Sequence, residues 1–137
     1  MSWAHSLIRL STYEVETLQK RLAEAVGRRE AAEMKRLMLD AEGEAEARRA
    51  NEDVEAGWSH AAFIEGLRAR KAAADADIAR LALEEQGARD ALAEAFEAQK
   101  KYEHVAEAAR LLAKREAAKR ETVAMDELGV RRAAGGR

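Results

Sequence analysis

A seven-residue repeat of apolar positions runs through most of the chain, and no proline interrupts it. Apolar residues at this spacing form one stripe along a helix, and the stripe packs against a second helix. Proline would end such a helix, because it lacks a backbone N–H and its ring clashes with the preceding turn. In the first half, the two columns of the repeat are Ile8, Val15, Leu22, Arg29, Arg36 and Gly43, and Ser11, Leu18, Ala25, Ala32, Leu39 and Glu46.

The repeat resumes in the second half and is longer there. One column is Leu67, Ala74, Leu81, Ala88, Ala95, Tyr102 and Ala109; its companion is Ile64, Ile78, Leu92, Ala106 and Ala113, interrupted by Lys71, Glu85 and Gln99. Charged residues make up 36% of the sequence and aromatic residues only 4%, so that the apolar residues suffice for a seam between helices but not for a broad core. The sequence therefore predicts an all-α coiled coil.

The repeat breaks between about Ala50 and Ser59, where Asn51, Asp53 and Gly57 favour a turn. We expect one coiled-coil domain over residues 1–137. Its expected parts are a first helix over about 4–50, a turn over about 51–58, a second helix over about 59–130 and a loose tail over 131–137.

The start of the second helix carries a possible capping signal. The Ser59 hydroxyl can accept a hydrogen bond from the first turn, and Trp58 and Phe63 have the spacing of a hydrophobic staple. A break at this point favours an antiparallel hairpin, in which facing residues have numbers that sum to about 110, as Leu18 and Leu92 do. A parallel homodimer of one unbroken helix is the alternative fold.

The two predicted helices are unequal, at about 72 Å and about 105 Å long. Beyond about Ala108 the second helix has no partner within the chain, and residues 108–137 carry a net charge of +4. Residues 40–57, in contrast, carry a net charge of −5. An unpaired basic helix that also bears apolar residues is expected to bind a partner.

Sequence motifs for catalysis or for cofactor binding are not found. The chain has no cysteine and no Gly-rich phosphate loop, and its three histidines lie far apart. His104 and Glu107 have a spacing that two metal ligands could share, but a solvated helix face explains the pair better. We expect no catalytic, cofactor-binding or metal site. The acidic middle and a pI of about 6.0 argue against nucleic-acid binding. No apolar run approaches the roughly 20 residues that span a bilayer, and no secretory signal is visible, so we expect a cytoplasmic protein.

Two local motifs resemble the FliJ family of the bacterial flagellar type III export apparatus. The first is Phe63-Ile64-x-x-Leu67, and the second is Met125-Asp126-Glu127 followed by Arg131, Arg132 and Ala133. The resemblance implies a stalk whose paired termini insert into the hexameric flagellar export ATPase and promote ring formation. It also implies contacts with the cytoplasmic domain of the export-gate membrane protein and with export chaperones. Such a protein lies at the cytoplasmic face of the inner membrane and reaches it only through partners.

The resemblance further assigns residues to the two surfaces. The ring-binding residues would be Ile8, Leu10, Arg110, Lys114, Arg115, Lys119, Arg120, Val123, Met125 and Leu128; the gate-binding residues would be Met34, Met38, Phe63 and Leu67. Ala41 and Ala45 stand where family members carry tyrosines, so the sequence departs from the family there. As an alternative, Phe63 only staples the helix start and Leu67 belongs to the seam. A general coiled-coil scaffold and the stalk of a virulence-type secretion system are the other functions that this sequence fits.

Overall fold

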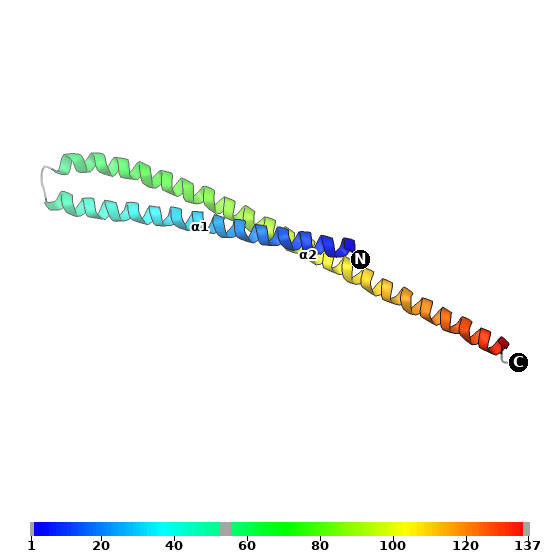
Figure 1. The fold of residues 1–137 in the computed structure, drawn as a ribbon. Helices are drawn as coiled ribbons and strands as arrows, with labels where there is room; N and C mark the ends of the chain where they lie inside the picture. Colours follow the sequence, from blue (N-terminus) through cyan, green and yellow to red (C-terminus); the bar gives the residue numbers. More distant parts are fainter. Residues whose placement is uncertain (1, 53–55, 136–137) are drawn as a thin grey trace. The chain divides into compact units, whose positions relative to one another are not determined.

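The computed structural model describes residues 2–52 and 56–135, which form two helices, α1 (Ser2–Glu52) and α2 (Ala56–Gly135) (Figure 1). The prediction of an all-α fold is confirmed over the described residues. The chain separates into two compact units, each built from a part of both helices. We call residues 16–94 the hairpin unit, and residues 1–15 together with 95–137 the terminal unit.

The two helices run antiparallel in the hairpin unit, where Figure 1 shows the cyan part of α1 beside the green part of α2. Arg29 of α1 contacts Glu85 of α2 at 2.7 Å, and Arg70 of α2 contacts Glu42 of α1 at 2.7 Å. Residue numbers therefore rise along one helix as they fall along the other. The numbers within each pair sum close to the expected 110, so the predicted antiparallel pairing and its register are confirmed.

The terminal unit repeats this pairing over a shorter length. The Gln99 side-chain amide of α2 donates a hydrogen bond of 3.1 Å to the Thr12 hydroxyl of α1. The residue numbers of Thr12 and Gln99 again sum close to 110, so the terminal unit has the same register as the hairpin unit. Beyond Ala109, α2 has no buried or half-buried residue among those described.

The core is a single line of side chains along the seam. Its buried apolar residues are Ala4, Val15, Ala25, Leu39, Leu67, Leu81 and Ala95, which all belong to the predicted columns or extend them by one repeat. Ser11, Glu46 and Glu85 are buried in the same columns although they are polar. The heptad pattern therefore located the core, including the positions at which it is polar.

Gly43 lies at a tight contact between the helices of the hairpin unit. A Cβ atom added there would lie 2.8 Å from the Leu67 Cδ2 atom, nearer than carbon atoms normally pack. The glycine therefore makes room for a buried leucine, and its place in the repeat reflects packing.

Both helices extend further than the sequence indicated. Because α2 begins at Ala56, Ser59 lies inside the helix and does not cap it. Trp58 is 91% exposed, so it forms no staple with Phe63. A glycine such as Gly57 costs a helix only about 1 kcal/mol, which continued backbone hydrogen bonding can offset. Of the predicted turn, residues 51–52 and 56–58 are helical, and residues 53–55 lie outside the described residues.

The predicted tail is also largely helical, since α2 continues to Gly135. Residues 131–134 are arginines and alanines, which are good helix formers, and Gly129 alone is too weak a break to stop the helix. Residues 136–137 lie outside the described residues.

Candidate partner-binding surfaces

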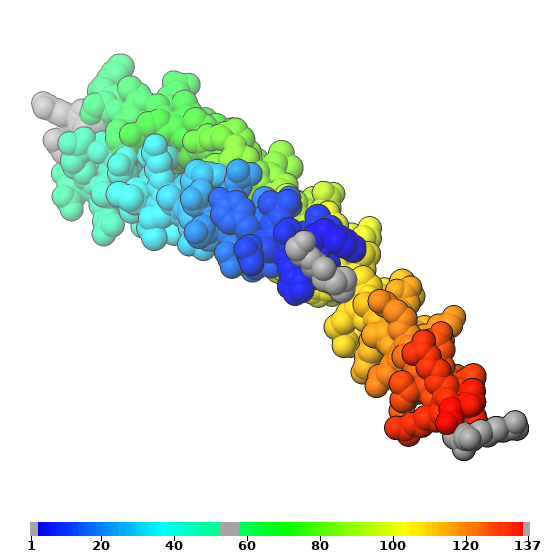
Figure 2. Space-filling view, turned by 45° about the vertical axis from the view of Figure 1, so that its right-hand side comes forward, coloured from blue at the N-terminus to red at the C-terminus, as the bar shows by residue number. Residues whose placement is uncertain are grey.

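The described end of α2, residues 111–135, is exposed at every position, and we call it the overhang (orange to red in Figure 2). Several of its apolar side chains are half exposed or more. Val123 is 50% exposed, Leu128 is 54% exposed and Met125 is 69% exposed. Exposed apolar residues that lie among charges are typical of a surface that a partner covers.

Positive charge concentrates in the first half of the overhang. Lys114, Arg115, Lys119 and Arg120 are exposed and form no ion pair within the described part of the chain. Their charge is therefore available to an acidic partner. Within the described residues, this stretch of α2 thus has none of the inter-helix ion pairs that the hairpin unit has.

Two shallow grooves run along one face of the overhang and meet at Val123. Glu116, Lys119 and Arg120 line the first together with Val123. Val123 and Val130 are the apolar residues that line the second groove. Val123 and Val130 continue the seam column beyond the reach of α1, so the face that would bury a second helix is open here.

The start of α1 contributes to the same unit. Ile8 and Arg110 line one groove, together with Ala4 and Ala106. Arg110 donates hydrogen bonds of 2.7 and 3.0 Å to the Glu107 carboxylate, which raise the pKa of Arg110 and lower the pKa of Glu107. The structure thus brings Ile8 and Arg110, one candidate residue from each helix, to the same groove, whereas the side chain of Leu10 is 63% exposed.

Two further exposed aromatic residues of the terminal unit were not predicted as binding residues. Trp3 is 51% exposed and Tyr13 is 68% exposed. Neither occupies a seam column, so a search by heptad spacing passes over them. Composition is the signal that could have found them. Aromatic residues are rare in this chain, and those that lie outside the seam are candidates for contact with a partner.

The candidate gate-binding residues lie in the hairpin unit. Met34 and Met38 are 59% and 60% exposed and share a face of α1 at i,i+4 spacing. Phe63 is half-buried, whereas Leu67 is only 4% exposed and packs in the seam against Gly43. Leu67 also lies at the edge of a groove that Leu37 and Ala41 help to line. Leu67 therefore shapes this region from within, as the seam alternative predicted, and offers little surface to a partner.

His104 and Glu107 have the spacing of two metal ligands, and the Glu107 carboxylate accepts hydrogen bonds from Arg110. A search of the described residues finds no group of His, Asp and Glu side chains that could hold a metal ion. Within those same residues, neither helix contains a segment long and apolar enough to cross a membrane.

These observations define a class: a two-helix antiparallel coiled coil that presents binding surfaces, with one helix continuing past the end of its partner. The sequence is 57% identical over 136 residues to the proteins called flagellar FliJ protein in two strains of Caulobacter vibrioides, and the match covers 98% of this chain and 98% of each relative. The chain belongs to the FliJ family. No protein-family model matches the sequence, and no solved structure matches it.

Proposed function

We propose that this chain is a non-enzymatic stalk of the flagellar type III export apparatus, with the terminal unit as the part that enters the export ATPase ring. The observation that carries the proposal is the overhang, a helix that is exposed at all its described positions and bears both unpaired positive charge and apolar side chains. Membership in a family whose relatives are named flagellar proteins supports it. A single helix without tertiary contacts gains little stability of its own, so the inner surface of the ring would supply the missing contacts.

Charge and apolar contact have separate roles in this proposal. Lys114, Arg115, Lys119 and Arg120 would attract an acidic ring and speed the encounter, because charge complementarity raises association rates more than affinity. Val123, Met125 and Leu128 would then provide the contact that holds the stalk. Ile8 and Leu10 would enter with them, since they belong to the same unit.

The hairpin unit would serve the second contact, with the cytoplasmic domain of the export-gate membrane protein. Met34, Met38 and Phe63 are the side chains that can reach a partner, and Leu67 would hold the surface in shape from the seam. Empty export chaperones would be further partners. The protein would work in the cytoplasm beside the inner membrane at the flagellar base and would need neither a cofactor nor nucleic acid.

Charge reversal in the full-length chain tests the ring contact. In the test variant, glutamates replace Lys114, Arg115, Lys119 and Arg120. We expect at least a ten-fold loss of affinity for the flagellar export ATPase, loss of stimulated ATP hydrolysis and loss of motility, with helicity unchanged because these side chains are exposed.

The matched control reverses four exposed positive charges of the hairpin unit, at Lys20, Arg21, Lys35 and Arg68. It changes net charge by the same amount and should keep ring binding. If the overhang variant bound and stimulated the ring as the control does, the proposed role of the overhang would be wrong.

A further inference from the structure

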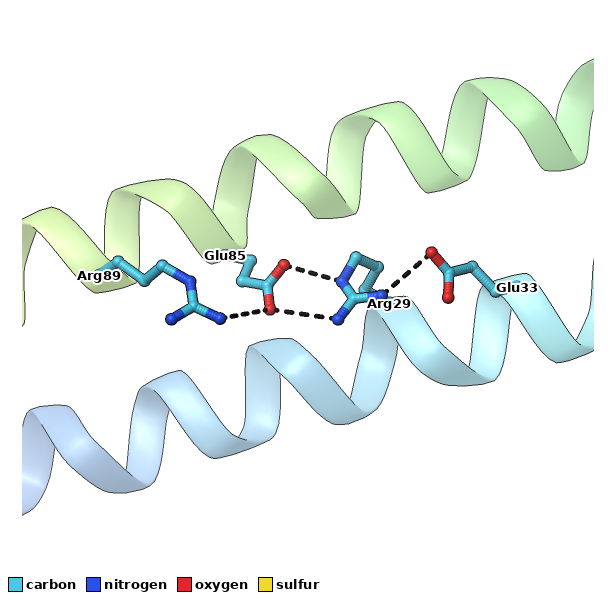
Figure 3. Close-up of polar contacts among 4 residues, drawn as sticks. All are labelled: Arg29, Glu33, Glu85 and Arg89. Atoms are coloured by element: carbon cyan, nitrogen blue, oxygen red, sulfur yellow. Dashed lines mark hydrogen bonds and ion pairs between the residues drawn. The ribbon is translucent and has the colours of Figure 1, made fainter.

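Arg29 and Glu85 are charged residues at positions where the repeat calls for apolar side chains. Glu85 is 8% exposed, and Arg29 lies opposite it across the seam (Figure 3). The Arg29 guanidinium donates two hydrogen bonds to the Glu85 carboxylate, of 2.7 Å from Nε and 3.4 Å from Nη2. The pair therefore forms a polar layer in a line of contacts whose buried residues are mostly apolar.

Each member of the pair has a second partner on its own helix. Arg29 Nη1 donates to Glu33 at 3.0 Å, and Arg89 Nη2 donates to Glu85 at 3.3 Å. Figure 3 shows the four side chains in a row between the helices. The hydrogen bonds from Arg29 lower the pKa of Glu85, and those to Glu85 and Glu33 raise the pKa of Arg29. Both groups are thus held in their charged forms.

A polar layer of this kind is a poor source of stability. Removing two charges from water costs about as much as their attraction returns, and apolar residues of similar volume often do as well or better. Such a layer can instead disfavour other helix pairings. In a shifted or reversed pairing, a charged seam residue loses its partner but still has the cost of desolvation. The arrangements that this layer would disfavour are the other ways in which these helices could pair.

Parallel pairing of two copies would set each seam residue against itself. Arg29 would meet Arg29 of the second copy, and Glu85 would meet Glu85 of the second copy. Arg36 and Lys71 of the seam columns would meet like charges in the same way. In the observed antiparallel arrangement these two residues instead bind Asp75 at 2.8 Å and Asp40 at 3.0 Å.

Sliding the helices by one repeat breaks the Arg29–Glu85 pair in either direction. A slide in one direction carries Arg36 toward Lys71, a contact of two positive charges, and carries Arg29 toward Ile78. A slide in the other direction brings Arg36 toward Glu85 but carries Arg29 toward Leu92, where the seam columns offer it no carboxylate. Apolar layers alone would tolerate either slide, because alanine and leucine recur at every step of the repeat.

We propose that the Arg29–Glu85 layer selects the orientation and register of the two helices, so that a seam rich in alanine has one pairing. This inference concerns the hairpin unit and does not depend on the proposed export function. Its prediction is specific: replacing the layer with leucines should preserve or raise thermal stability while reducing the fidelity of pairing.

Engineered cysteines can report the pairing, because the chain has no cysteine of its own. The pair Leu18→Cys and Leu92→Cys reports the native register. Two shifted pairs, Ala25→Cys with Leu92→Cys and Ala25→Cys with Ile78→Cys, report a slide in either direction. Leu18→Cys alone reports parallel association through a disulfide-linked dimer.

In the full-length parent, oxidation should cross-link only the native pair within one chain. In the double variant Arg29→Leu/Glu85→Leu, the shifted or parallel cross-links should rise at least ten-fold, equivalent to about 1.4 kcal/mol of lost discrimination. The midpoint of thermal unfolding should stay level or rise. The charge swap Arg29→Glu/Glu85→Arg should keep the parental cross-linking pattern, and Arg29→Glu alone should lose it.

The neighbouring pair Arg28–Glu84 is the matched control. It joins the same two helices at 3.8 Å, but its side chains are 55% and 44% exposed. The variant Arg28→Leu/Glu84→Leu should leave register unchanged. The proposal would be overturned if Arg29→Leu/Glu85→Leu still cross-linked only in the native register, or if the control lost fidelity to the same extent.

Discussion

The hairpin unit and the terminal unit use the same kinds of residue differently. In the hairpin unit, arginines of one helix contact carboxylates of the other, as Arg36 does with Asp75 at 2.8 Å and Arg70 with Glu42 at 2.7 Å. In the overhang of the terminal unit, none of the six positive side chains has an ion-pair partner within the described residues. Composition alone therefore does not distinguish a helix that packs within the chain from a helix that is open to a partner. What separates them is whether a complementary helix lies opposite.

Truncation of an apolar residue in each unit should give the largest contrast. Leu81→Ala removes a leucine that is 7% exposed in the hairpin seam, and we expect it to lower the free energy of unfolding by about 2–3 kcal/mol. Leu128→Ala removes a leucine that is 54% exposed, and its effect should stay within about 0.5 kcal/mol. Urea unfolding followed by circular dichroism measures both. Equal losses would mean that the overhang is packed in solution.

Lowering the pH should cost the hairpin unit more stability than the terminal unit. Because the pKa of Glu85 in the folded chain is lowered from 4.5, its ionised form favours folding at pH values above 4.5, and this stabilisation is lost as the pH falls below that value. Glu85→Gln should therefore shrink the difference between the unfolding midpoints at pH 7 and pH 3. The pKa of Asp40 is also lowered, by hydrogen bonds from Lys71 and Arg36, so part of the acid loss should remain.

Glu107→Gln is the control from the terminal unit. The pKa of Glu107 is lowered too, by hydrogen bonds from Arg110, but the two side chains are 55% and 57% exposed. Solvent weakens such surface pairs, so the substitution should change the acid response less than Glu85→Gln does. Equal responses of the two variants would mean that the seam carboxylate and the exposed carboxylate contribute alike to stability against acid.

Glycine substitutions should give the smallest effect and can sharpen the picture within the hairpin unit. Gly87→Ala places its Cβ in open space and should stabilise the chain by up to about 1 kcal/mol through helix propensity. Gly43→Ala should gain less, because its Cβ would meet Leu67 and the leucine would have to move. Thermal melts of the two variants measure the difference. A gain at Gly43 equal to that at Gly87 would mean that Leu67 relaxes freely.

Heptad spacing could predict the fold because, in the part of the chain that the structure describes, the buried apolar residues all lie in the seam between the two helices. It placed Val15, Leu39 and Leu81 in the core, and it predicted the register. The helix ends were less predictable, since Ser59 and Gly57 have turn propensities that a continuing helix overrides. Local preference of about 1 kcal/mol cannot decide where an alanine-rich helix stops.

The candidate surfaces could be predicted only in part. The overhang could be predicted because the repeat extends further in the second helix than in the first, so the two helices have unequal lengths. The burial of Leu67 did not, because a residue in a motif can serve either packing or binding, and only its contact with Gly43 decides. The partner of Glu85 was also hidden. The sequence marked Glu85 as a break in the repeat, but pairing with Arg29 depends on which residues face each other.

The exposure of the overhang also has a consequence for the lifetime of the chain. A helix without tertiary contacts opens locally at almost no cost, so its amide hydrogens exchange quickly and its basic residues offer cleavage sites to trypsin-like proteases. The hairpin unit must unfold before it becomes equally vulnerable. A copy whose overhang is bound to a partner would be protected from cleavage, whereas an unbound copy would be cleaved first. The fraction of the chain that survives proteolysis would then report the fraction that is bound.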